Sequence, residues 1–216
     1  MALAFSKTKG KAESKKVPTY EFKDGEQRIR LFGDVLARYI YWVKGLNNKD
    51  IPIECLAFNR DTEKFDNAEY DYVPENYPDL KCSWAYTVNA IDPVKMEEVA
   101  VNLKKKLFAE IIDAAEALGD PTDPDTGWDI VFKRSKTGSQ AFNVEYKLQV
   151  LKCKPRALSA EERELVAKAK TIDQKYPRPT AEDVLKTIKK IQAGPSSGND
   201  EDGGSDGDVP EEAKDL

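Results

Sequence analysis

Aromatic and basic side chains are interleaved in three β-type segments of this 216-residue chain. The densest segment runs from Arg38 to Lys44, the second surrounds Trp84, and the third is a hairpin that contains Phe142. Flat rings stack on unpaired bases and cations neutralise phosphates, so this combination is typical of single-stranded nucleic-acid binding. The predicted binding surface comprises Arg38, Tyr39, Tyr41, Lys44, Tyr70, Tyr72, Lys81, Trp84, Tyr86, Lys133, Arg134, Lys136, Phe142 and Tyr146.

A core position is the alternative for each of these rings, because strands also bury aromatic side chains. Residues two apart in a strand share a face, so Tyr39 and Tyr41 lie opposite Ile40 and Trp42. We expect Trp42 and Trp128 to be core. The rings that we expect to be exposed are Tyr39, Tyr41, Trp84, Tyr86 and Phe142, with a candidate flap formed by Tyr70, Tyr72 and Tyr77.

The absence of histidine is the most restrictive feature of the composition. It removes the commonest general acid or base, the commonest zinc ligand and every Ser-His or Cys-His nucleophile pair. The three cysteines, Cys55, Cys82 and Cys153, lack metal-type spacing and indicate buried thiols in a reducing compartment. We predict a protein that is not an enzyme and that uses no cofactor and no metal.

Two acidic segments offer a metal-dependent alternative. Asp120, Asp123 and Asp125, followed by Gly127, resemble part of a calcium loop, but the twelfth position from Asp120 is Val131 rather than glutamate. A second set could serve a two-metal nuclease, although a solvated loop explains it more simply: Asp61, Glu63, Asp66, Glu69, Asp71 and Glu75. A third class of function, an adaptor or virion component that does not bind DNA, also stays open.

The net charge of −5 conceals a strong asymmetry along the chain. Residues 194–216 carry −7, which leaves +2 for residues 1–193, and residues 1–20 carry +4. We predict a basic flexible arm at 1–20 and a disordered acidic tail at 194–216. The tail residues predicted to bind partners are Asp200, Glu201, Asp202, Asp206, Asp208, Glu211, Glu212, Asp215 and Leu216.

Hydrophobic periodicity and turn residues predict the elements that must position these side chains. Strands are expected at 28–32, 36–43, 51–58 and 81–91, and in a hairpin at 128–135 and 142–151. Helices are expected at 95–118, 160–172 and 181–192, the second of them opened by a capping box of Ser159 and Glu162.

This order predicts a mainly β fold with accessory helices, in which an OB-type five-stranded barrel has one helix before its final hairpin. Two C-terminal helices and the disordered acidic tail follow. The expected domains are the arm at 1–20, an OB-fold core for single-stranded DNA at 21–158, a helical extension at 159–193, and the tail at 194–216. No apolar run approaches the ~18 residues of a membrane span, and the N-terminus lacks the pattern of a secretory signal.

Several segments resemble the T-even-type phage single-stranded DNA-binding, or helix-destabilising, proteins. They are Arg28–Phe32, Ser83-Trp84-Ala85 within KCSWAYTVNAIDP, then DPDTGWDIVFKRSKTG and AFNVEYKLQV, all between residues 25 and 155. The resemblance implies an OB-type fold that binds single-stranded DNA cooperatively in replication, recombination and repair, in the cytoplasm of the infected bacterial host. It also places Trp84 and Phe142 beside DNA-contacting aromatic residues.

The same resemblance assigns roles to both ends of the chain. SKTKGK, with Lys7, Lys9 and Lys11, looks like the basic head that these proteins use for self-association along DNA. Their acidic tail recruits replication and recombination enzymes and occupies the DNA groove when DNA is absent. The chain departs from the family at 45–80, where the best-known members carry a zinc subdomain that a chain without histidine cannot reproduce.

Overall fold

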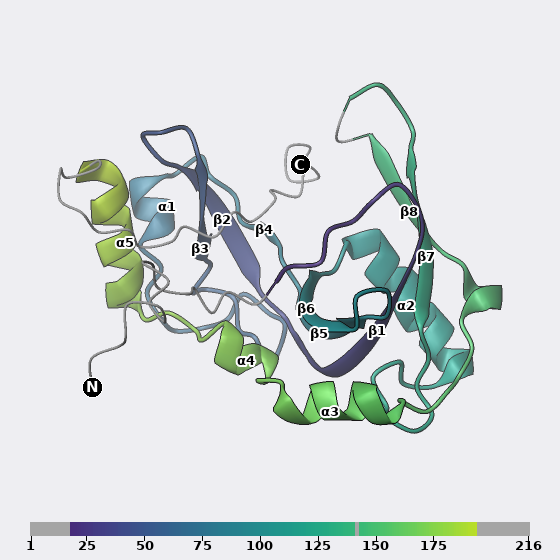
Figure 1. The fold of residues 1–216 in the computed structure, drawn as a ribbon. Coiled ribbons are helices and arrows are strands. Elements are labelled where there is room, and N and C mark those ends of the chain that lie inside the picture. Colours follow the sequence, from purple (N-terminus) through teal and green to yellow (C-terminus); the bar gives the residue numbers. More distant parts are fainter. Residues whose placement is uncertain (1–17, 141–142, 194–216) are drawn as a thin grey trace, which may run out of the picture.

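The computed structural model describes residues 18–140 and 143–193 (Figure 1). Within these residues the fold is mainly β, with eight strands in antiparallel sheets and five α-helices, and it is compatible with an OB-like fold. The predictions for the basic arm up to residue 17, for Phe142 and for the acidic tail fall outside the described part of the chain.

A five-stranded sheet has the order β6-β5-β1-β7-β8, with β1 (Gly25–Leu36) in its centre. The second half of β1 pairs with β5 (Thr87–Asp92), and its first half pairs with β7 (Ile130–Lys136). β6 (Glu97–Asn102) and β8 (Val144–Leu148) are the outer strands. One long strand therefore joins two hairpins, β5–β6 and β7–β8.

Residues 37–86 leave this sheet between β1 and β5 and form a second unit, which we call the insert lobe. Its three-stranded sheet has the order β3-β2-β4 and consists of β2 (Tyr39–Lys44), β3 (Asp50–Glu54) and β4 (Ser83–Trp84), with the short helix α1 (Val73–Asn76) in the connection to β4. The segment 45–80, where the resemblance would place zinc, contributes to a hydrophobic core that includes Tyr41, Val43, Ile53, Leu56, Phe58 and Val73. Figure 1 shows the insert lobe beside the five-stranded lobe, which contains β1 and β5–β8.

The helix α2 (Lys105–Leu118) connects β6 to β7 and packs against β8. It buries Leu107, Ile111 and Ala114, which recur at the three- and four-residue spacing of one helix face. Gly119 ends the helix at a φ of 82°, a conformation that costs glycine little. The indole Nε1 of Trp128 donates to the Gly119 carbonyl at 2.8 Å, and the complete burial of Trp128 confirms its predicted core position.

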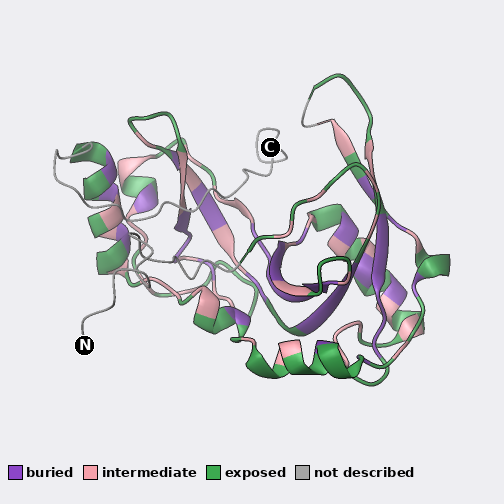
Figure 2. Ribbon diagram, in the orientation of Figure 1, coloured by how far each residue is buried: buried purple, intermediate pink, exposed green. Residues whose placement is uncertain are grey.

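Three helices follow β8 and a single 3-10 turn (Val150–Lys152): α3 (Ala160–Lys168), α4 (Ile172–Lys175) and α5 (Ala181–Ala193). α3 and α4 run along the five-stranded lobe, whereas α5 lies against the insert lobe (Figure 1). Figure 2 shows that much of α3 is exposed, while long stretches of the sheet beside it are buried. The predicted capping box is confirmed, because Ser159 Oγ accepts from Glu162 N and Glu162 accepts from Ser159 N.

Two of the predicted helices are wrong in extent. The helix expected at 95–118 begins only at Lys105, because residues 97–102 form β6 and pair with β5 along its whole length. Val99, Ala100 and Val101 of this strand are all buried, and Met96 turns the chain with a φ of 50°. The helix expected at 160–172 ends at Lys168, because Ala169 is extended and Thr171 caps a separate helix, α4.

Candidate nucleic-acid interface

A series of aromatic ring contacts runs from the insert lobe to the five-stranded lobe. Phe65 lies edge-on to Tyr39 at 5.1 Å between centroids, and Tyr39 contacts Trp84 at 6.4 Å. Trp84 stacks on Tyr86 at 3.5 Å with 13° between the planes, and both rings contact Phe108 of α2, at 5.6 and 5.9 Å. We call these five residues the aromatic seam.

The side chains of the aromatic seam differ in solvent exposure, from the exposed Phe65 to the buried Tyr86. Phe65 is 58% exposed, Tyr39, Trp84 and Phe108 are half-buried, and Tyr86 is 3% exposed. The indole Nε1 of Trp84 donates to the Leu103 carbonyl at 3.3 Å, so the tryptophan is held by a hydrogen bond as well as by its stack on Tyr86. Rings that are already ordered lose little conformational entropy when a ligand stacks on them.

The pairing of β2 with β4 brings together the two residues at the centre of the aromatic seam. Tyr39 of β2 lies directly opposite Trp84 of β4. Next to this pair, the Arg38 carbonyl accepts from Ala85 N at 3.0 Å, and the guanidinium of Arg38 donates back to the Ala85 carbonyl at 3.2 Å. That guanidinium also lies 4.3 Å from the ring centre of Tyr176, and burial lowers the pKa of Arg38. Arg38, predicted to contact DNA, therefore holds the junction of the two lobes together.

A second ring cluster lies in the five-stranded lobe, where Phe22 contacts Tyr146 at 5.3 Å and Phe132 at 5.6 Å. Lys104 Nζ lies 5.4 Å from the centre of the Phe22 ring and 5.8 Å from that of Tyr146. Arg134 Nε donates to the Tyr146 hydroxyl at 3.3 Å. Two cations and two rings thus meet here, although Tyr146 itself is buried.

The expected exposure of Tyr41 and Tyr86 is wrong, since both side chains are buried. β2 is the central strand of its sheet, and the Tyr41 hydroxyl accepts a hydrogen bond from the Cys55 thiol at 3.4 Å inside the insert lobe. Burial is the main cause of the raised pKa of both tyrosines. Trp42, expected to be core, is half-buried, and its Nε1 donates to Ser83 Oγ at 3.1 Å.

Two tyrosines and two lysines complete the predicted contact residues of the insert lobe. Tyr70 and Tyr72 contact each other at 4.7 Å, and the Tyr70 hydroxyl donates to Glu75 at 3.2 Å. Among the described residues, no ring contact links this pair to Trp84. Lys81 is exposed, and Lys44 is exposed and forms an ion pair with Asp50 at 2.6 Å.

The β7–β8 hairpin carries cations on both of its faces. Lys133 lies directly opposite Lys147, and both side chains are exposed. Like charges in that position destabilise a sheet unless an anion lies between or above them. Arg134 is on the other face with Tyr146 and pairs with Asp24, which also lies 3.8 Å from Lys136.

In the acidic turn at 120–129, aspartate side chains accept hydrogen bonds from backbone amides of the same turn. Asp120 Oδ1 accepts from Thr122 N at 2.8 Å, and Asp123 Oδ1 accepts from the backbone of Asp125 and Thr126 at 2.8 and 2.7 Å. Gly127 packs so closely here that a Cβ would lie 2.4 Å from the Asp123 carbonyl oxygen. Within residues 18–140 and 143–193, no three acidic, cysteine or histidine residues group as metal ligands, and no helix is long and apolar enough to span a membrane.

Sequence reasoning missed four residues that the structure brings into these clusters: Phe22, Phe65, Lys104 and Phe108. Phe65 carries a usable signal, since it is a large apolar residue within a polar loop. Phe108 falls on the apolar stripe of the predicted helix, and only the packing of α2 on Trp84 distinguishes it from ordinary core.

Comparison with known proteins identifies a similar phage protein. No family model matches the chain. A phage protein described as "Probable ssDNA-binding protein", from Escherichia phage T5, is 26% identical over an alignment 261 positions long, gaps included. The alignment covers 100% of this chain and 99% of that protein. The similarity is to a phage protein of this description and does not single out the T-even type.

Proposed function

We propose that this chain binds single-stranded DNA with little sequence preference and catalyses no reaction. The aromatic seam carries the proposal, because it presents rings of fixed orientation, from the half-buried Trp84 to the exposed Phe65. Bases would stack on these rings while nearby lysines and arginines neutralise phosphates. The similarity to the T5 protein supports the same function.

The five-stranded lobe is proposed to be an OB-type barrel. Its strands follow the order expected for that fold: β1 pairs with both the next strand of the lobe and the fourth, and α2 separates the third from the fourth. OB folds bind oligonucleotides over strands 2 and 3 and with the loops that follow strands 1 and 4. In this chain the first of those loops is the insert lobe, which supplies Tyr39 and Phe65, and the second is the turn of the β7–β8 hairpin.

Further parts of the proposal rest on the sequence. Residues 21–158 would be the DNA-binding core, 159–193 a helical extension, and 1–20 an arm whose Lys7, Lys9 and Lys11 support self-association on DNA. The tail at 194–216 would compete with DNA for the cationic surface and recruit replication and recombination enzymes in the host cytoplasm. The roles in phage replication, recombination and repair follow from this proposal.

Titration onto fluorescent oligo(dT), single- and double-stranded, at several salt concentrations tests the function. We expect single-strand-selective binding whose affinity falls with salt, by about 0.7 log units per log unit of salt for each phosphate contact. A chain without residues 194–216 should bind more tightly. If neither protein binds, the DNA-binding proposal is wrong and a protein-binding adaptor becomes the better interpretation.

A further inference from the structure

The C-terminal extension is fastened to the five-stranded lobe at its beginning. Arg156 forms a two-pronged ion pair with Glu162, with both N–O distances at 2.7 Å, and its Nε donates to Asp129 at 3.0 Å. Both carboxylates are buried. Ion pairs of this fork geometry fix orientation as well as position. The start of α3 is thereby held against the residues that lead into β7.

The middle of the extension covers the outer face of β5 and β6. The side chain of Lys175, on α4, is 3% exposed; its Nζ donates to Asn89 Oδ1 at 2.5 Å and pairs with Glu98. Asn89 in turn donates from Nδ2 to the Lys170 carbonyl at 3.0 Å. Two small apolar clusters, Phe32–Ile91–Leu158 and Leu36–Ala100–Ile172, complete this contact. These two partners fix the position of the Lys175 side chain and so the position of α4 on β5 and β6.

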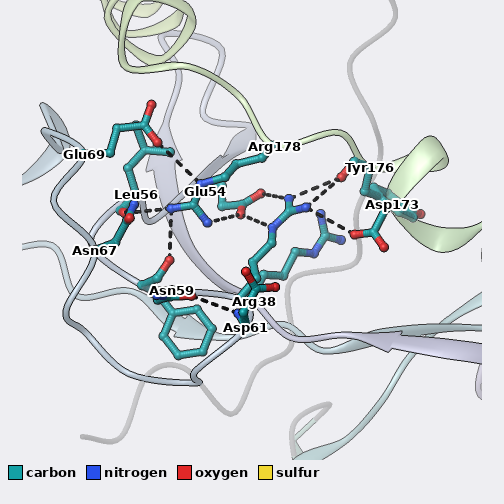
Figure 3. Close-up of polar contacts among 12 residues, drawn as sticks. Arg38, Glu54, Leu56, Asn59, Asp61, Asn67, Glu69, Asp173, Tyr176 and Arg178 are labelled. Carbon is teal, nitrogen blue, oxygen red and sulfur yellow. Dashed lines mark hydrogen bonds and ion pairs between the residues drawn. The ribbon is translucent and has the colours of Figure 1, made fainter.

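The end of the extension is fastened to the insert lobe (Figure 3). Arg178 Nη2 donates to the carbonyls of Leu56 and Phe58 at 2.7 and 3.0 Å. Arg60 donates from Nε and Nη2 to the two carboxylate oxygens of Glu54, at 2.7 and 2.6 Å. Its Nη2 also donates to the carbonyl of Tyr176, a residue of the extension. These bonds hold the segment between α4 and α5 against the insert lobe.

The helix α5 reinforces this end of the contact. Glu69 of the insert lobe accepts from Ala181 N at 3.1 Å, at the first residue of α5. α5 then buries Val184, Ile188 and Ile191, which belong to the main hydrophobic core together with residues of the insert lobe.

The covalent connection between the lobes is a two-stranded ribbon, and the ring contacts of Trp84 and Tyr86 with Phe108 lie beside it. The chain passes between them twice, from β1 to β2 and from β4 to β5, and these two passages pair with each other at Leu36–Thr87 and Tyr39–Trp84. A two-stranded ribbon bends and twists more easily than a wide sheet. The C-terminal extension, which is fastened to both lobes away from this ribbon, restricts the bending and twisting of the ribbon.

We propose that residues 156–193 act as a strap that fixes the angle between the lobes and thereby aligns the two halves of the aromatic seam. Arg60 and Arg178 are then positioning residues for DNA binding, because four rings of the seam belong to the insert lobe and the fifth, Phe108, belongs to α2 of the five-stranded lobe. This inference rests on the proposed function only for its effect on DNA. The effect on lobe geometry stands independently.

Distance measurement between two spin labels tests the strap. Ketone-containing amino acids at Lys49 and Thr137, which are exposed at the tips of the β2–β3 and β7–β8 turns, accept labels without modifying the three cysteines. In the full chain we expect Arg178→Ala to broaden the distance distribution and Arg178→Lys to restore much of it. Lys186→Ala, an exposed position on α5, is the matched control and should behave as the unmodified chain.

Oligo(dT) affinity is measured on the same proteins. If the lobes are aligned in about a tenth of the Arg178→Ala molecules, the apparent Kd rises about tenfold. Should that variant fail to fold, Glu69→Ala, which removes a half-buried carboxylate, serves in its place. An unchanged distance distribution in a folded variant overturns the strap, whatever the affinity does. A broadened distribution in a chain that never binds DNA upholds the strap and refutes the proposed function.

Discussion

Trp84 lies flat on Tyr86, with 3.5 Å between the ring centres and 13° between the planes. The two residues are two apart in the chain, yet one is half-buried and the other is buried. Tyr86 thus backs the tryptophan from the core side. A base that stacks on Trp84 would extend an existing stack rather than order a free ring.

Replacing Trp84 with alanine should weaken single-stranded DNA binding by about 1–3 kcal/mol, or roughly 5- to 150-fold in Kd. The loss should be similar on oligo(dT), oligo(dA) and mixed sequences, because stacking reads no base edge. Trp84→Phe keeps a ring on Tyr86 and should retain most of the affinity. Circular dichroism and thermal unfolding separate lost binding from lost folding. Unfolding of Trp84→Ala would make the residue a core position.

Phe65 and Tyr70 provide a matched comparison, since each is 58% exposed. Phe65 contacts the aromatic seam, whereas Tyr70 contacts Tyr72. Phe65→Ala should therefore raise the Kd for oligo(dT) well above the effect of Tyr70→Ala, and neither should change the thermal midpoint by much. Equal losses would extend the interface to Tyr70 and Tyr72, as the sequence predicts.

Much of the strand pattern follows from the sequence, and the failures have physical causes. The spacing of Leu103, Leu107 and Ile111 predicts a helix, and placing its start at residue 95 includes the residues that form β6. Asp92-Pro93 marks the end of the strand before this turn, but the positive φ of Met96, a non-glycine residue, has no signal in the sequence. The long-range partners of β1 are likewise invisible to local periodicity.

The site was predictable in kind but not in arrangement. Alternation along the strands identifies Tyr39 and Trp84 as neighbours of cations, and in the structure these two residues lie directly opposite each other. The alternation of residue types cannot show which face of a strand packs against the rest of the protein. Tyr41 is buried because it packs into the main hydrophobic core, and Phe65 contacts Tyr39 only because of how its loop folds.

Lys133 and Lys147 should both contribute to the salt dependence of binding. If each contacts one phosphate, Lys133→Gln with Lys147→Gln should reduce the slope of log Kd against log salt by about 1.4. The pair Lys189→Gln and Lys190→Gln removes the same charge from exposed positions on α5 and should leave the slope unchanged. Identical slopes for both double variants would mean that only total charge matters.

The Glu162 carboxylate predicts a pH-dependent contribution to stability. Its ion pair with Arg156 and the hydrogen bond from Ser159 N lower the pKa of Glu162 in the folded state. The stabilisation is therefore complete above the unfolded pKa of about 4.3 and is lost as the pH falls through the lower folded value. Glu162→Gln should cost about 1.5–3 kcal/mol near pH 7.

Thermal unfolding of both proteins from pH 7 to pH 3 measures this contribution. The difference in Tm between the wild type and Glu162→Gln should narrow below about pH 4.3. Glu164→Gln, an exposed change in the same helix, should show little difference at any pH. A Tm difference between the wild type and Glu162→Gln that stays constant down to pH 3 would contradict a stabilising role of the ionised Glu162 carboxylate.

The cysteines should differ in reactivity. Cys82 is half-buried, and its interaction with the neighbouring Cys55 side chain lowers its pKa, whereas Cys55 and Cys153 are buried with raised pKa values. Because the thiolate is the nucleophile, iodoacetamide should modify Cys82 first, as peptide mass spectrometry would show. Bound oligo(dT) should slow this modification, since Trp84 is two residues away, and duplex DNA should not. Equal rates at all three thiols would rule out the predicted difference.

The position of β1 in the sheet also bears on how the protein folds. Gly25 pairs with Arg134, about a hundred residues further along the chain, so one side of β1 cannot be paired until β7 has been synthesised. Sheets built on such distant contacts fold slowly compared with helical bundles of similar size. The β2–β3 hairpin, in contrast, needs only residues 39–54. A nascent chain can therefore form that hairpin early, while the strand that will become the centre of the larger sheet stays unprotected on the ribosome.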